Sequence, residues 1–155
     1  MDDDAPFLLN GQLLVASPGI GDDRFARSVV YVCAHSNEGA MGIVVNKPAD
    51  DLVFADLLAQ LKLLPEGGAI HAPLNVRNMD VLHGGPVETS RGFVLHAADP
   101  KRDFGSVAVN GEIRLSANIE ILQAIARGEG PQEAMFALGY AGWSAGQLEM
   151  EMQDN

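Results

Sequence analysis

Residues 142–146 read Gly-Trp-Ser-Ala-Gly and form the pattern G-x-S-x-G, which in one class of hydrolases places a nucleophilic serine on a sharp strand-to-helix turn. That chemistry needs a histidine base that follows the serine along the chain. No histidine follows His96, so we assign no catalytic residue here. The sequence favours a glycine-rich turn from Gly142 to Gly146 that begins a helix, with Ser144 near the N-cap.

The four histidines and the single cysteine, Cys33, are the other side chains with reactive or metal-binding chemistry. Zinc sites need three or four such ligands, usually at short paired spacings. His83 and His96 lie on neighbouring predicted strands without such spacing, and Cys33 has no partner thiol. We therefore expect no metal, and we expect these histidines to bond to backbone at strand ends. An enzyme of unrecognised type that uses His83 or His96 is the alternative.

Two glycine-rich segments could approach a ligand. Residues 19–21 lack the third glycine of a dinucleotide fingerprint, and no phosphate-binding G-x-x-x-x-G-K-[ST] loop occurs, so we expect no cofactor. Gly84-Gly85-Pro86 could let a ligand touch the backbone, because glycine permits close approach. A tight turn at a strand end explains the same residues.

Polar groups follow a buried apolar run at Asn46-Lys47-Pro48. An amide and an ammonium at the mouth of a strand can converge on a ligand, whereas strand termination with a solvated Lys47 is the competing interpretation. Trp143, the only tryptophan, is expected to be buried, with its ring near Gly84-Gly85-Pro86 and a pocket shared between the two segments. An exposed ring that awaits a partner is the alternative.

Hydrophobic patterns predict the strands that must position these residues. Residues 28–35 and 40–46 predict a hairpin about the loop 36–39, after a first apolar run at 13–16. Further strands are predicted as a returning pair at 81–83 and 92–96, a hairpin of 106–109 with 112–115 about Asn110-Gly111, and a last strand at 135–140.

Apolar residues at helical spacing predict three helices. The first begins near Phe54 with Asp50 or Asp51 as its N-cap, the second spans residues 119–126 with Ser116 as its cap and ends at Gly128, and the third begins at Gln147. The order predicts one α/β (α+β) domain over residues 1–155, with a mixed, largely antiparallel sheet covered by helices.

The net charge of the chain restricts the classes of partner that it can bind. The chain of 155 residues has 21 acidic and 10 Lys or Arg residues and a net charge of −11. Phosphate backbones and anionic membranes are bound by clustered cations, so direct DNA binding and membrane docking are disfavoured. One cysteine and the acidic start Met1-Asp2-Asp3-Asp4, without a signal-peptide pattern, predict a cytoplasmic protein.

Four blocks in order resemble the YqgE/AlgH family, also called UPF0301 or DUF179. They are residues 13–18 with 25–31, the "EGA-x-G-hydrophobic-N-[KR]-P" block at 38–48, the "GGPV…GF-x-LH" block at 84–87 and 92–96, and the "GYAGW-x-x-GQLE" block at 139–149. The resemblance implies a bifurcated, barrel-like sheet and a segment of about thirty further residues after the last block that this chain lacks. Some members are labelled transcriptional regulators, and the family implies no established reaction.

We therefore expect a non-catalytic cytoplasmic regulatory domain that binds a small molecule or a protein. Its candidate ligand-binding residues are Asn46, Lys47, Pro48, Gly84, Gly85, Pro86, His96, Trp143, Gly146 and Gln147. The alternatives are the enzyme described above and an indirect association with nucleic acid. The sequence leaves the oligomeric state open.

Overall fold

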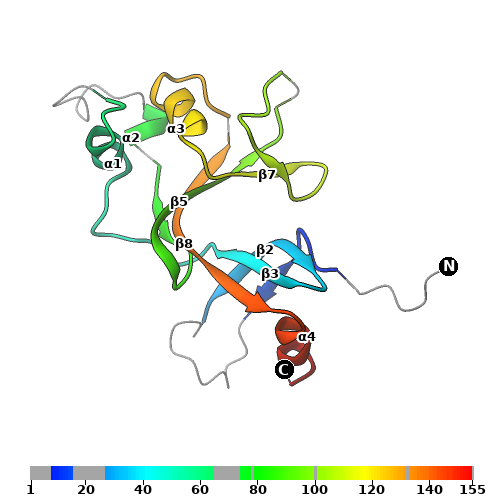
Figure 1. The fold of residues 1–155 in the computed structure, drawn as a ribbon. Coiled ribbons are helices and arrows are strands. Elements are labelled where there is room, and N and C mark those ends of the chain that lie inside the picture. The colour runs from blue at the N-terminus through cyan, green and yellow to red at the C-terminus, as the bar shows by residue number, and fades with distance from the viewer. Residues whose placement is uncertain are drawn as a thin grey trace.

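Apolar runs rich in β-branched residues form the strands, in nearly the predicted order. The computed structural model describes residues 8–15, 27–64, 74–77, 79–99, 101–131 and 133–154. The strands are β1 (Leu13–Val15), β2 (Val29–Ser36), β3 (Gly39–Val44), β4 (Val81–His83), β5 (Val87–Ala97), β6 (Val107–Ala108), β7 (Ile113–Ser116) and β8 (Ala134–Ser144) (Figure 1). The helices are α1 (Phe54–Gln60), α2 (Leu74–Arg77), α3 (Ile119–Ala126) and α4 (Gln147–Asp154).

Strand β8 is the centre of one curled sheet. The strand order is β1-β2-β3-β8-β5-β7-β6, and β4 is a further neighbour of β8. Phe136, in the first half of β8, pairs with Val81 of β4 and Val94 of β5, whereas Gly142, in the second half, pairs with Met41 of β3. The sheet is therefore bifurcated at β8. Its pairings are antiparallel except that of β4 with β8, which confirms the predicted fold class.

Glycines allow the sheet to branch. The backbone N–H of Gly84 donates to Leu138 O at 2.8 Å, and the Gly84 carbonyl accepts from Val44 N at 2.8 Å. A Cβ on Gly84 would lie 2.3 Å from Gly139 O, and one on Gly85 would lie 2.1 Å from the carbonyl carbon of Tyr140. No side chain fits between chains this close. The Gly84-Gly85 segment is thus packed directly against the β8 backbone.

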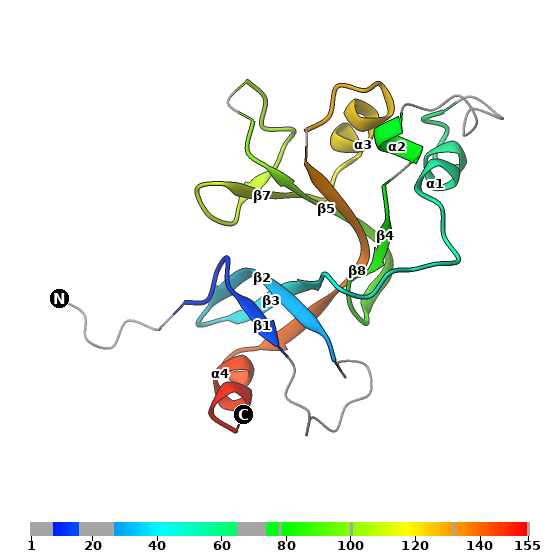
Figure 2. The ribbon, with the colours of Figure 1, turned by 180° about the vertical axis from the view of Figure 1, so that it is seen from behind.

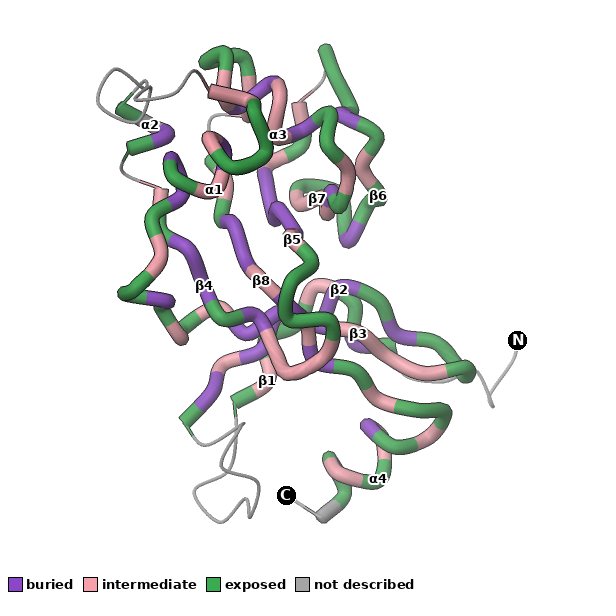
Figure 3. The backbone as a smooth tube through the Cα atoms, turned by 60° about the vertical axis from the view of Figure 1, so that its left-hand side comes forward, coloured by how far each residue is buried: buried purple, intermediate pink, exposed green. Residues whose placement is uncertain are grey.

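The two faces of the sheet around β5 and β8 carry separate hydrophobic clusters. Val94 and Phe136 pack with Phe54 of α1 and Ile121 of α3 on the face that the helices cover. Phe93 and neighbouring apolar residues form a second cluster on the concave face. Figure 2 shows α1, α2 and α3 together at one end of the molecule and α4 at the other, and Figure 3 shows the buried stretches of β4, β5 and β8 near one another.

Side-chain contacts join the edges of the curl. Asn110, in the loop between β6 and β7, donates from Nδ2 to the hydroxyl of Tyr31 on β2 at 3.2 Å. The buried His35 ring accepts from the N–H of Leu9 through Nδ1 at 3.1 Å, and its Nε2 lies 3.3 Å from a carboxylate oxygen of Glu149 on α4. These contacts connect the sheet to the segment before β1 and to the last described helix.

Several local predictions are wrong. Residues 81–83 and 92–96 do not pair as a returning strand, because both lie against β8. The N-cap of α1 is Val53, without a side-chain cap, rather than Asp50 or Asp51. The N-cap of α3 is Asn118, whose side chain accepts from the N–H of Ile121 at 3.2 Å.

Other local predictions are confirmed. The hairpin of β2 and β3 and the pairing of β6 with β7 are present, and Gly128 follows the C-cap of α3 with a φ of 77°. The predicted turn at residues 17–23, the segment 65–73 and His71 lie outside the described residues.

Candidate binding groove

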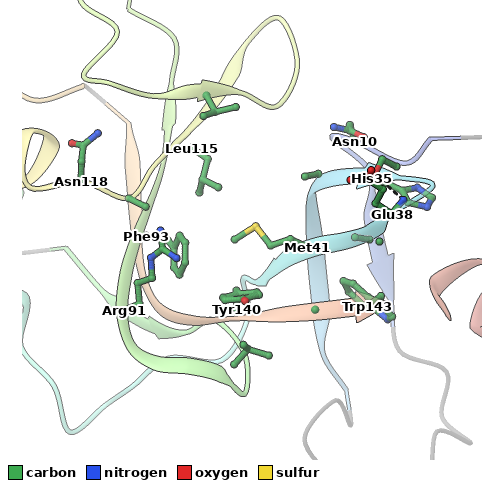
Figure 4. A pocket seen from close by; sticks show the side chains of 18 of the residues that line it. Asn10, His35, Glu38, Met41, Arg91, Phe93, Leu115, Asn118, Tyr140 and Trp143 are labelled. Atoms are coloured by element: carbon green, nitrogen blue, oxygen red, sulfur yellow. Dashed lines mark hydrogen bonds between the residues drawn. The ribbon is translucent and has the colours of Figure 1, made fainter. Parts of the chain in front are cut away.

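A broad groove of about 1040 Å³ lies on the concave face of the sheet. Its walls come from the β2–β3 hairpin on one side and from β5, β6 and β7 on the other, with β8 between them (Figure 4). Its lining residues include Met41, Phe93, Leu115, Tyr140 and Trp143. Ligand sites in proteins are concave and mostly apolar, with a few polar groups that orient the ligand. This groove has that composition.

The floor is apolar because alternate residues of several strands point to the same side. Phe93 and Tyr140 pack edge to face, with ring centroids 5.6 Å apart. Met41 and Leu115 are partly buried against the same cluster, whose buried members include Cys33. Burial raises the pKa of the Cys33 thiol to about 12, so it remains protonated and is not a nucleophile near neutral pH.

The rim carries the polar groups. The Arg91 guanidinium lies 5.1 Å from the centre of the Phe93 ring, and one of its nitrogens is 3.4 Å from a carboxylate oxygen of Glu88. Glu38, on the β2–β3 turn, is exposed at the opposite wall (Figure 4). The amide of Asn118 also lines the groove, but it caps α3 and donates to Phe104 O at 3.1 Å.

His96 faces away from this groove. It lies three positions after Phe93 on β5 and therefore points to the helix-covered face. Nδ1 donates to the carbonyl of Ala97 at 3.0 Å, so in the neutral ring Nε2 accepts from the hydroxyl of Ser116 at 2.8 Å. Burial lowers the pKa of His96, and the charge of Arg114 lowers it further, against the hydrogen bond to Ala97. Its environment is that of a neutral core histidine.

His83 does not join His96. It is exposed on β4 and pairs with Leu138, whereas His96 lies on the other side of β8 and pairs with Ala134. Within the described part of the chain, no group of three or more His, Cys, Asp or Glu side chains is placed to hold a metal ion. No helix among the described residues is long and apolar enough to cross a membrane.

Asn46 and its neighbours connect the ends of strands. The Asn46 side chain donates to Arg27 O and accepts from Val29 N, both at 2.8 Å, and so continues the β2–β3 ladder by one rung. The carbonyl of Lys47 accepts from His83 N at 2.8 Å, and Pro48 forms a bridge with Leu82. This segment covers the edge of β4. Its residues do not line the groove.

The last sequence block is a strand rather than a turn up to Ser144. Trp143 pairs with Ala40, is half-buried, and packs with Val32 and Leu148. Gly85 instead meets β8 at Tyr140, and no described cavity is lined by both Trp143 and the Gly84–Pro86 segment. The predicted glycine-rich turn is therefore limited to residues 145–146.

Ser144 is the last residue of β8, three residues before α4, and it contacts the first residue of that helix. Its N–H and hydroxyl both donate to Oε1 of Gln147, at 2.9 and 3.2 Å. The side chain of Gln147, the first residue of α4, therefore bonds back to the strand end, and the first helical bond runs from Met150 N to Gly146 O at 3.1 Å. Gly146 has a φ of 76°, which favours glycine at this bend. Gln147 and Gly146 thus shape the start of α4.

Of the ten residues predicted to bind a ligand, Trp143 is the one that lines the groove. Sequence reasoning missed Met41, Arg91, Phe93, Leu115 and Tyr140, which come from four strands. Alternation within each strand indicates which of these side chains share a face. It does not show which strands curl toward one another, because that depends on the pairing around β8.

The comparisons with known proteins agree with this fold. The AlgH-like family model, DUF179, matches residues 13–155. A UPF0301 protein of Methylobacterium nodulans is 60% identical over 147 residues, which are 95% of this chain and 70% of the relative. One of Methylocella silvestris is 56% identical over 95% of this chain and 71% of its own length.

Two solved structures share the architecture. The solution structure of the AlgH protein from Pseudomonas aeruginosa has a TM-score of 0.77 at 41% identity, covering 100% of this chain and 78% of that one. A crystal structure from Corynebacterium diphtheriae has a TM-score of 0.68 at 19% identity, covering 99% of this chain and 75% of that one, and shows the fold alone. With the family model matching nearly the whole chain and the fold agreeing, the chain belongs to the AlgH-like family, DUF179.

Proposed function

We propose that this protein is a non-catalytic regulatory domain of the cytoplasm whose ligand occupies the groove on the concave face of the sheet. The observation that carries the proposal is the groove itself. It combines an apolar floor built from Met41, Phe93 and Leu115 with a polar rim that includes Arg91 and Glu38. Such a surface binds by burial of apolar area and is oriented by a few polar contacts.

The catalytic alternative has less support. It depends on His83 or His96, and the latter is buried on the face away from the groove with both ring nitrogens hydrogen-bonded. Direct contact with DNA is disfavoured by the net charge of −11. A regulatory effect on transcription would therefore act through a small ligand or another protein.

A thermal-shift screen against metabolites, nucleotides and short peptides tests the proposal. A ligand that binds only the folded state at 100 times its dissociation constant adds about 2.7 kcal/mol to the free energy of unfolding and raises Tm. We expect Met41→Gln, on the groove floor, to lose most of this shift. Met150→Gln provides the matched control, because Met150 is exposed on α4 outside the groove. An equal shift in wild type and Met41→Gln would refute binding in the groove.

A further inference from the structure

The groove has opposite charges on its two walls. Arg91 is on β5, and Glu38 is on the turn between β2 and β3. Figure 4 shows them on opposite sides of the groove, with Met41 and Tyr140 between them. Among the residues that line the groove, Arg91 and Glu38 are the Arg, Lys, Asp or Glu side chains. A ligand that spans the groove therefore meets a cation at one end and an anion at the other.

Arg91 is well placed to exchange its present partner for a ligand. The guanidinium carbon lies over the Phe93 ring, 5.1 Å from its centroid, and an arginine in contact with an aromatic face can still donate hydrogen bonds from its N–H groups. Its contact with Glu88 is 3.4 Å long, and both side chains are 52% exposed. Exposed pairs of this kind contribute little to stability. A carboxylate that accepts two parallel hydrogen bonds from the guanidinium would be the better partner.

Strand β6, which is two residues long, is an edge of the sheet beside the same groove. It is the last strand in the sheet order, and among the described residues it pairs with β7 alone. Val107 of β6 lines the groove and is 70% exposed. An extended polypeptide can pair with such an edge while alternate side chains point to an apolar floor.

We infer, on the basis of the proposed function, that the groove binds an extended segment of a partner protein with an acidic residue at one end, a basic residue at the other and apolar residues between them. The acidic residue pairs with Arg91 and the basic residue with Glu38. The apolar residues lie on Met41 and Tyr140, which are half-buried and lie between the charged walls, with the buried Phe93 beside them.

Four labelled heptapeptides test this inference by fluorescence anisotropy. They share a Val-Thr-Leu-Thr-Val centre and have blocked termini. Their first and last residues are Glu and Lys in one peptide, Glu and Glu in the second, Lys and Lys in the third, and Gln and Gln in the fourth. We expect the wild-type protein to bind the Glu and Lys peptide at least about tenfold more tightly than the Gln and Gln peptide, since one charge-assisted hydrogen bond is sufficient for that ratio.

Charge reversal on each wall predicts a change of preference. Arg91→Glu makes both walls acidic and should select the Lys and Lys peptide, whereas Glu38→Lys makes both basic and should select the Glu and Glu peptide. Lys101→Glu and Glu133→Lys are the matched controls, because these exposed residues lie outside the groove and change the net charge equally. Both controls should keep the wild-type preference. Circular dichroism melting checks that each variant folds.

The inference is overturned if Arg91→Glu and Glu38→Lys keep the wild-type order of peptides, or if none of the four peptides binds. If no peptide binds but a compound from the thermal-shift screen raises Tm in wild type and not in Met41→Gln, the proposed function is still supported. A compound or peptide that binds Met41→Gln and wild type equally contradicts the proposed function itself. The two failures are therefore distinguishable.

Discussion

His96 illustrates how burial removes a reactive side chain from chemistry. The residue is 3% exposed, and its ring packs edge to face against Phe104 with centroids 5.8 Å apart. The ring is hydrogen-bonded to Ala97 O and to the Ser116 hydroxyl. Both bonds suit the neutral ring. Because water is excluded, protonation would place a charge in the core, and the pKa of His96 is lowered for this reason first.

A lowered pKa predicts how stability depends on pH. In the unfolded chain His96 is protonated near its ordinary pKa of about 6.5, whereas in the folded chain it is protonated only at lower pH. The stabilisation is therefore complete above about pH 6.5 and is lost as pH falls from there toward the folded pKa. We expect urea unfolding to show a smaller loss of stability between about pH 7.5 and pH 5.5 in His96→Gln than in wild type.

The comparison must separate His96 from the other titrating groups. Exposed His83 is the matched control, because His83→Gln removes a histidine without removing a buried one, and it should retain the wild-type pH dependence. Equal slopes in wild type and His96→Gln would mean that the ring titrates alike in the folded and unfolded chains.

The strands and helices show which elements the sequence determines locally. The β2–β3 hairpin and α3 were predictable, because alternation, turn residues and helical spacing act within one segment. The N-cap of α3 was not. Ser116 and Asn118 are both good caps, and the choice depends on Ser116 being buried against His96 from another strand.

Strand β8 continues beyond its predicted end for a similar reason. Gly142 suggests a turn when read alone, since glycine weakens a strand. In the structure Gly139 has a φ of 79°, and a Cβ there would lie 2.4 Å from Gly85 O. Gly139 marks the point where β4 ends against β8, and Gly142 pairs with Met41 of β3, which only the tertiary pairing reveals.

The branch point predicts a strong effect of one methyl group. A Cβ on Gly84 would lie 2.3 Å from the carbonyl oxygen of Gly139, and backbone atoms on both sides cannot move without breaking the hydrogen bond from Gly84 N to Leu138 O. We expect Gly84→Ala to lower the free energy of unfolding by at least about 2 kcal/mol, as overpacking does. Urea denaturation at equilibrium measures this change.

Gly111→Ala is the control for this experiment. Gly111 is exposed in the β6–β7 loop, and nothing lies within 4 Å of its added Cβ. Its free energy of unfolding should change by no more than about 0.5 kcal/mol. If both alanine variants were equally stable, the close approach of β4 and β8 would be wrong.

At the scale of the molecule, the sequence and the structure contribute different parts of the candidate site. The motif residues Asn46, Gly84 and Gln147 have structural roles in a ladder, a branch and a helix start. The groove instead joins residues of unremarkable type, such as Met41 and Leu115, from strands far apart along the chain. Only the curl of the sheet about β8 brings these side chains together, and no local pattern encodes that curl.

The net charge of −11 is a property of the whole molecule and predicts how salt affects its stability. Like charges on a compact protein repel one another, and this repulsion lowers the free energy of unfolding. Two opposing attractions, the Arg91–Glu88 and Arg102–Glu129 pairs, are both on the surface, at 3.4 and 3.8 Å, and exposed pairs contribute at most about 1 kcal/mol each. Sodium chloride shortens the Debye length from about 30 Å at 0.01 M to about 10 Å at 0.1 M and screens the long-range repulsion.

We therefore expect Tm, followed by circular dichroism, to rise between 0.01 M and 0.1 M sodium chloride. The double variant Glu112→Gln, Glu133→Gln removes two exposed charges and should start from a higher Tm in low salt with a smaller rise. A fall of Tm with added salt would show instead that attractive pairs dominate the electrostatics of the folded chain.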